Sequence, residues 1–151
     1  RSRDFDTSAE KFFEAEALAP NSADLLLQHA DALAHFGDAE IAWEKFQQAI
    51  DLNPLAPDIY WWAGASIAFK REDYGTAVEL CGRMENDEPA LRVLTASHAL
   101  HGDLVAARES GSRLQENYPG MTAREISSLS PDRDPVANER FYQALRLAGI
   151  K

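Results

Sequence analysis

One pattern of polar and interior positions occurs four times along this chain of 151 residues. Each copy begins with an Asp, continues with three interior positions at steps of four and three residues, and ends at a Pro. That spacing returns the interior positions to one face of a helix with about 3.6 residues per turn. The copies are Asp4-Ser8-Phe12-Ala15-Pro20, Asp38-Ala42-Phe46-Ala49-Pro54, Asp73-Ala77-Cys81-Met84-Pro89 and Asp103-Ala107-Gly111-Leu114-Pro119. The pattern predicts one amphipathic helix in each copy.

The residues at the ends of each copy predict where these helices begin and end. An Asp carboxylate can accept hydrogen bonds from the first free N–H groups and suits the positive end of the helix dipole. A Pro beyond the last turn stops a helix. Second helical stretches, residues 23–36, 58–71 and 88–101, lie between the copies, and two of them end next to Gly37 and Gly102, which suit a left-handed C-cap. We therefore expect helical hairpins of roughly 34 residues.

Self-similarity at this period predicts an all-α solenoid, in which each unit buries its apolar face against its neighbours. We expect the second helix of a repeat at 4–20, repeats at 23–54, 58–87 and 88–119, and a C-terminal cap at 120–151. The first repeat has only its second helix, and the chain starts without Met, so we expect a piece of a longer protein.

The cap has its own signals. Thr122 with Glu125 forms a capping-box pattern, and Asp134 followed by Pro135 predicts the start of a second helix. This second helix should present Phe141, Leu145 and Leu147 as its apolar face and stop at Gly149. It is expected to cover the last repeat; the alternative is that it lies in the groove of the solenoid and blocks it.

The order of residues within the units resembles the tetratricopeptide repeat, a family that implies a right-handed solenoid used for binding. In the first complete unit the matching residues are Leu26, Ala30, Leu33, Gly37, Ala42, Phe46, Ala49 and Pro54. In the next unit they are Trp61, Ala65, Tyr74, Ala77 and Pro89. The chain departs from the family pattern at Glu72, where Gly is usual, at Gly111, where an aromatic residue is usual, and in its shortened third unit.

The C-terminal region is similar to the repeat regions of certain bacterial class III adenylate/guanylate cyclases and winged-helix transcriptional regulators. The resemblance depends on Asp134, Pro135, Glu139, Arg140, Phe141, Leu145, Ala148 and Gly149. It implies that a catalytic or DNA-binding domain could precede this region in a full protein.

Charge and composition exclude several classes of function. The net charge is −10, and residues 1–53 carry 11 Asp and Glu against 4 Lys and Arg, whereas residues 88–151 carry 8 of each. Such an acidic surface repels phosphates, so we expect no nucleic-acid binding; it consists of solvated helix faces or attracts a basic partner. No segment has the length or apolarity of a membrane span. Cys81, the single cysteine, is expected to be a buried structural thiol, consistent with a cytoplasmic protein.

Catalytic motifs are absent from the sequence. We find no phosphate-binding loop, nucleophile elbow or CxxC pair. His98 and His101 lack a third metal ligand, His29 fits a core histidine, and Asp132 and Asp134 fit helix caps. We therefore expect no enzymatic activity, no cofactor and no metal site.

A binding groove can be predicted from helix geometry, because the first helices of stacked hairpins line the concave surface. Trp62, Ser66 and Phe69 form a second stripe beside the interior residues of their helix and suggest an apolar floor. The alternative is that they pack against neighbouring repeats or the C-terminal segment. The other expected groove residues are Gln28, Asp31, His35, Lys70 and Arg92. Family members that bind chaperone C-termini need Lys and Asn where this chain has Leu27 and Asp31, so that ligand is not expected.

These observations predict a protein-interaction or regulatory module that binds a protein or peptide in its groove. The alternative function is a domain that senses a ligand or peptide and controls an attached cyclase or DNA-binding domain. A third possibility is a homo-dimer formed through the open N-terminal edge.

Overall fold

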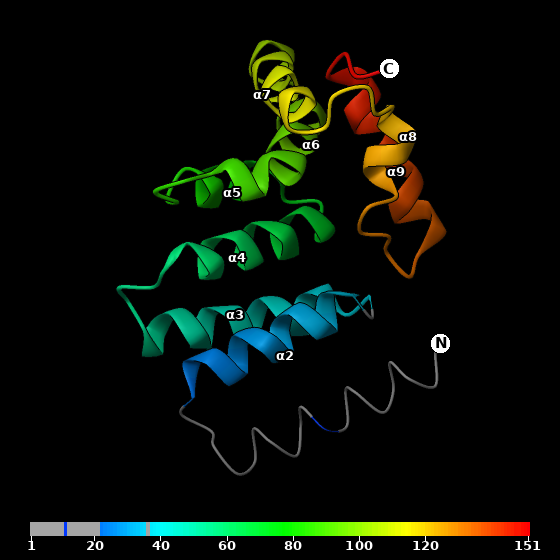
Figure 1. Ribbon diagram of the computed structural model, residues 1–151. Helices are drawn as coiled ribbons and strands as arrows, with labels where there is room; N and C mark the ends of the chain where they lie inside the picture. Colours follow the sequence, from blue (N-terminus) through cyan, green and yellow to red (C-terminus); the bar gives the residue numbers. More distant parts are fainter. Residues whose placement is uncertain (1–10, 12–21, 36) are drawn as a thin grey trace.

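The computed structural model describes residues 11, 22–35 and 37–151, and every regular element within them is helical (Figure 1). The predicted all-α class is therefore confirmed for this part of the chain. Apart from Lys11, the helix predicted at residues 4–20 lies outside the described residues. The elements are α2 (Ala23–His35), α3 (Ala39–Leu52), α4 (Asp58–Lys70), α5 (Tyr74–Cys81), the 3₁₀ turn η1 (Glu88–Ala90), α6 (Leu91–His101), α7 (Leu104–Asn117), α8 (Ala123–Ser127) and α9 (Pro135–Leu147).

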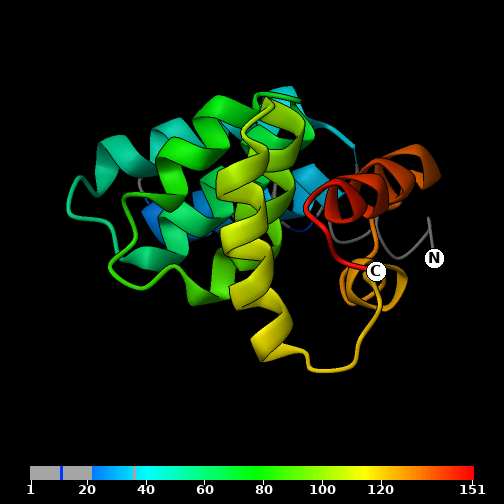
Figure 2. The same cartoon turned by 90° about the horizontal axis from the view of Figure 1, so that it is seen from above.

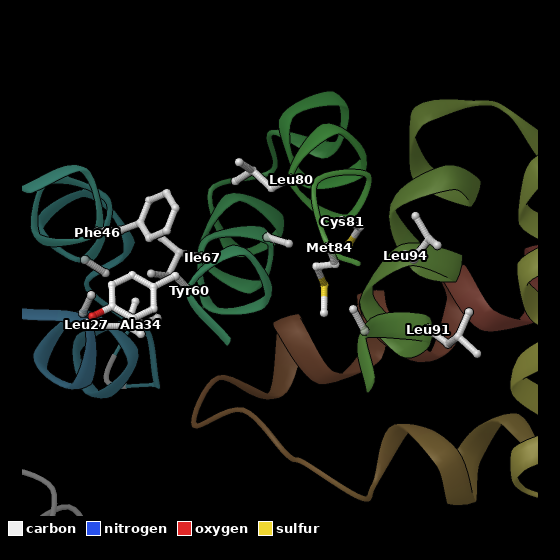
Figure 3. Close-up of a cluster of buried hydrophobic side chains, with 14 of the residues drawn as sticks. Leu27, Ala34, Phe46, Tyr60, Ile67, Leu80, Cys81, Met84, Leu91 and Leu94 are labelled. Carbon is white, nitrogen blue, oxygen red and sulfur yellow. The ribbon is translucent and has the colours of Figure 1, made fainter. Parts of the chain in front are cut away.

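Helices that follow one another in sequence pack together in pairs. α2 packs on α3, α4 on α5 and α6 on α7, and each pair contacts the next (Figure 1). Large side chains fill the space between the first two pairs, as Figure 3 shows for Phe46, Tyr60 and Ile67. The helices are thus held by apolar packing, in two core clusters, rather than by local propensity alone.

The three turns inside these pairs have the same backbone structure. The carboxylates of Asp38, Asp73 and Asp103 accept hydrogen bonds from the N–H groups of Ile41, Thr76 and Ala106, which confirms the predicted N-caps. The N–H groups of the same three Asp residues donate to the carbonyls five residues earlier, those of Leu33, Ala68 and His98. The residue before each Asp has a positive φ: 90° at Gly37, 62° at Glu72 and 93° at Gly102. Glu72 therefore keeps the left-handed cap although it is not Gly.

α5 is shorter than the repeat pattern predicts. The expected helix should run toward Pro89, but α5 ends at Cys81, and Pro89 lies in η1. The chain turns here because Asp58, at the start of α4, accepts hydrogen bonds from the N–H groups of Glu85 (2.8 Å) and Asn86 (3.0 Å). Cys81 is still buried, and burial raises its pKa to about 12, which confirms the predicted structural thiol.

The C-terminal segment folds back onto the last pair (Figure 2). The Thr122–Glu125 capping box opens α8, and Asp134 caps α9, as predicted. On the apolar face of α9, Leu145 is buried and Phe141 is partly buried against the core, as predicted; Leu147 is 50% exposed, so its predicted place on that face is wrong.

Gly111 explains how closely the end of the chain approaches α7. A Cβ atom at Gly111 would lie 3.3 Å from the carbonyl oxygen of Ala148. An aromatic residue, usual at this position of the repeat, would collide with the C-terminal segment. This departure from the repeat pattern therefore makes room for α9, which packs chiefly against α6.

Candidate functional site

One cavity of about 690 Å³ lies between α2, α4, the start of α6 and residues 130–141. Its walls come from segments that are far apart in sequence and are brought together by the stacking of the pairs. All eight residues expected to line the groove do so: Gln28, Asp31, His35, Trp62, Ser66, Phe69, Lys70 and Arg92. Helix geometry therefore predicted residues on the near side of this cavity, although it could not define the cavity's far wall.

The floor of the cavity comes from α4. Trp62 is partly exposed, and the hydroxyl of Ser66 donates a hydrogen bond to the carbonyl of Trp62 one turn earlier (3.1 Å). Phe69 is only 8% exposed, because its ring packs between Tyr74 (5.5 Å between centroids) and Phe141 (5.6 Å). The expectation of a partly open face is thus wrong for Phe69, which packs against the C-terminal segment. Trp62 remains the accessible aromatic residue of the floor.

The rim on the α2 side is polar. Asp31 and His35, one turn apart, lie 3.8 Å from each other, and Gln28 is exposed beside them. His29 belongs to the same helix but is fully buried on its other side. Burial and the positive charge of Lys45 lower the pKa of His29 to about 4, so this imidazole is neutral at pH 7. His29 is a core residue, as expected, and not part of the site.

Lys70 joins α4 to the C-terminal segment. Its ammonium group lies 2.6 Å from a carboxylate oxygen of Asp132 and 3.4 Å from the carbonyl oxygen of Ala34. Asn138 holds Asp132 in place: its side chain accepts from the Asp132 N–H (2.6 Å) and donates to the Asp132 carbonyl (2.9 Å). The interpretation of Asp132 as a helix cap is therefore wrong, whereas Asp134 does cap α9.

Arg92 lies in the first turn of α6 with its guanidinium over the ring of Phe141, 5.2 Å from the centroid. Burial lowers its pKa. A second arginine of this wall, Arg140, lies 3.7 Å from the Glu72 carboxylate. The cavity thus combines aromatic surface from α4 and α9 with charged side chains from several elements.

The sequence did not predict that residues 130–141 form a wall of this cavity. The residues missed are Ser130, Asp132, Asp134, Ala137, Arg140 and Phe141. The sequence left open whether the last helix covers the final pair or lies in the groove. Only the second alternative would have placed this segment beside the expected groove residues. In the structure α9 packs against the last pair and borders the groove, leaving the cavity beside it.

Two further features bear on the function. Among the described residues, no group of three or more His, Cys, Asp or Glu side chains is placed to hold a metal ion. Within the same residues, no helix has the length and apolarity needed to cross a membrane.

No protein-family model matches this chain, and no curated protein matches it significantly. The resemblance to tetratricopeptide repeats therefore depends on the residues quoted for it.

Proposed function

We propose that this chain is a protein-interaction module of the tetratricopeptide type, a right-handed solenoid whose groove binds a peptide segment of a partner. The observation that carries the proposal is that all eight expected residues line the same cavity. Its accessible aromatic floor and polar rims match the usual composition of binding sites, in which a few anchors contribute most of the affinity.

The matched turns of the three pairs support the repeat interpretation. They share the same Asp cap and the same left-handed residue before it. Repeats of this kind present the first helix of each pair on the concave side. Here these are α2, α4 and α6, and each of them contributes side chains to the cavity.

A pull-down with the wild-type chain and two tryptophan variants tests this function. Trp62→Ala removes the accessible part of the floor, and we expect it to abolish capture of the partner. Trp43→Ala is the matched control, because Trp43 is also a partly buried tryptophan but does not line the cavity. Equal capture by the wild type and Trp62→Ala, with both variants folded, would contradict the proposal.

A second candidate is a sensor domain that binds a small molecule or short peptide and controls an attached cyclase or DNA-binding domain. The cavity volume favours it, since pockets for small ligands typically measure about 300–1,000 Å³. A compound-library thermal-shift screen tests this candidate: a ligand that raises Tm of the wild type but not of Trp62→Ala supports it. If the wild type captures a protein partner and no compound raises its Tm, the interaction module is favoured.

A further inference from the structure

Four arginines within residues 22–35 and 37–151 stack on aromatic rings. The pairs, with the distance from Cζ to the ring centroid, are Arg71 on Trp43 (5.0 Å), Arg83 on Trp61 (5.1 Å), Arg92 on Phe141 (5.2 Å) and Arg124 on Tyr142 (3.6 Å). Three of these arginines also pair with a glutamate: Arg71 with Glu40 (3.0 Å), Arg83 with Glu79 (3.3 Å) and Arg124 with Glu139 (3.0 Å). Arg92 has no ion pair with any residue that the structure describes, and its Nε has no hydrogen-bond partner there.

Arg92 is also the only one of the four that lines the cavity. A partly buried cation loses hydration, and this cost is normally offset by a carboxylate. The other cations of the cavity wall have such partners, since Lys70 pairs with Asp132 and Arg140 lies near Glu72. Because Phe141 covers the face of the Arg92 guanidinium and Nε is buried, the terminal N–H groups are the ones left for a ligand.

We propose that Arg92 binds a carboxylate carried by the peptide that occupies this groove. This inference rests on the proposed function and specifies its ligand. The occupant is an internal segment of a partner protein with one Asp or Glu side chain next to a large apolar side chain. The carboxylate pairs with Arg92, and the apolar side chain contacts Trp62.

The other charges of the cavity favour a peptide with one carboxylate. Asp31, Glu72, Asp132 and Asp134 line the same cavity, whereas its cations Lys70 and Arg140 already lie beside Asp132 and Glu72, and the chain as a whole has a net charge of −10. A run of acidic residues, or a chain terminus that adds its own carboxylate to an acidic side chain, would be repelled by these groups.

The C-terminal segment of this chain already binds in the way we propose for the partner. Asp132 places its carboxylate on Lys70, and Phe141 packs on Phe69, both within the same cavity. The Lys70 and Asp132 side chains are only 21% and 13% exposed, so this carboxylate and cation are both largely withdrawn from water. Arg92 and Trp62 offer a second cation and a second aromatic surface to an external segment.

Peptide selection tests the inference with the whole chain as bait. A phage library of random octapeptides is selected on the wild type, and we expect the enriched peptides to share one Asp or Glu beside an aromatic or large aliphatic residue. The strongest peptide is then synthesised with its acidic residue and with the matching amide. Its Kd is measured by calorimetry for the wild type, Arg92→Gln, Arg92→Lys and the control Arg83→Gln, in which a stacked arginine outside the cavity is replaced.

Arg92→Gln should weaken binding of the acidic peptide by roughly ten- to a hundredfold, the usual range for a lost charge-assisted hydrogen bond. Arg92→Lys keeps the positive charge but loses the planar guanidinium with its paired N–H donors, so it should weaken peptide binding less than Arg92→Gln does. Arg83→Gln should leave Kd unchanged. The amide peptide should bind the wild type as weakly as the acidic peptide binds Arg92→Gln, and combining both changes should add little, since they remove the same interaction.

The possible failures are distinguishable. Enriched peptides that need Trp62 but lack an acidic residue, or that bind Arg92→Gln and Arg92→Lys as tightly as the wild type, would overturn the role of Arg92 and leave the groove as a binding site. Failure to enrich any peptide, or enrichment insensitive to Trp62→Ala, would overturn the proposed function and this inference together.

Discussion

Trp61 and Trp62 are neighbours in the sequence of α4 but have different surroundings. Trp61 packs edge-on against Phe46 at 6.4 Å, and Arg83, itself paired with Glu79, covers its ring. Trp62 lines the cavity and shares it with Arg92, which has no carboxylate partner in the described chain. Trp43 is covered by Arg71, which pairs with Glu40, so Trp43 resembles Trp61 rather than Trp62.

This difference separates the residues that support the fold from those available for binding. The arginine stacked on Trp43 and the arginine stacked on Trp61 each form an ion pair with a glutamate, so the charge of each arginine is already compensated. Around Trp62 both aromatic surface and a cation remain available. The residues that support the fold belong to the repeated pattern. The residues available for binding are those at which the copies differ.

The largest predicted effect on stability concerns α9, the helix that borders the cavity. Leu145 of α9 is fully buried, and Leu145→Ala should lower the free energy of unfolding by about 3 kcal/mol. Leu147→Ala, two residues away but 50% exposed, should lower it by less than about 0.5 kcal/mol. Urea denaturation measures both values. Equal losses would show that α9 does not pack against the last pair as described.

The buried histidine of α2, His29, should make the stability of the chain depend on pH. His29 is buried with a pKa lowered to about 4, whereas the unfolded chain protonates near its ordinary value of 6.5. The unfolded state therefore binds the proton first as pH falls, and the stability associated with neutral His29 is present above pH 6.5 and is lost between pH 6.5 and 4. The loss is on the order of 2 kcal/mol.

Urea denaturation at pH 7, 5.5 and 4.5 measures this loss. His29→Gln should remove most of the pH dependence in that range, while His35→Gln, on the cavity rim, should retain it. A wild-type stability that stays constant from pH 7 to 4.5 would contradict the assignment of His29 as a neutral core residue.

The repeated turns should affect stability without affecting binding. Asp73→Ala removes an N-cap of α5 and should lower the free energy of unfolding by about 1 kcal/mol. Asp73→Asn keeps a good capping side chain and should cost much less. Both variants should bind a selected peptide with the wild-type Kd, measured by calorimetry; a tenfold change would mean that the turns and the cavity are not separate.

The smallest predicted effect is at Glu72. Its φ of 62° is a conformation that Gly adopts without strain, so Glu72→Gly should leave the free energy of unfolding unchanged or raise it by up to about 1 kcal/mol. Gly102→Glu at the matching position should lower it. Thermal denaturation compares the two, and destabilisation by Glu72→Gly would show that the contact of Glu72 with Arg140 outweighs the backbone strain.

Local signals in the sequence were sufficient for most helix ends and for the near side of the cavity. An Asp cap, a left-handed turn and the helical period are local, so α2, α3, α4, α6 and α7 were predictable, and so was the face on which Trp62 and Arg92 lie. The early end of α5 was not, because it depends on Asp58 binding the loop at Glu85, a contact between distant residues.

The far wall of the cavity was unpredictable for the same reason. The place of Asp132 depends on Lys70, 62 residues earlier, and on how closely Ala148 can approach Gly111. Nothing in the pattern of residues 120–151 specifies those partners. The burial of Phe69 follows from them, because Phe141 covers its ring.

The three tryptophans allow the most direct test that the groove is the binding site. Their indole N–H resonances in a ¹⁵N-labelled chain, assigned by single Trp→Phe substitutions, can be followed during titration with a selected peptide. If the cavity is the site, the Trp62 resonance shifts with the peptide, while those of Trp43 and Trp61 stay in place. A peptide that binds and shifts Trp43 or Trp61 but leaves Trp62 unchanged would contradict it.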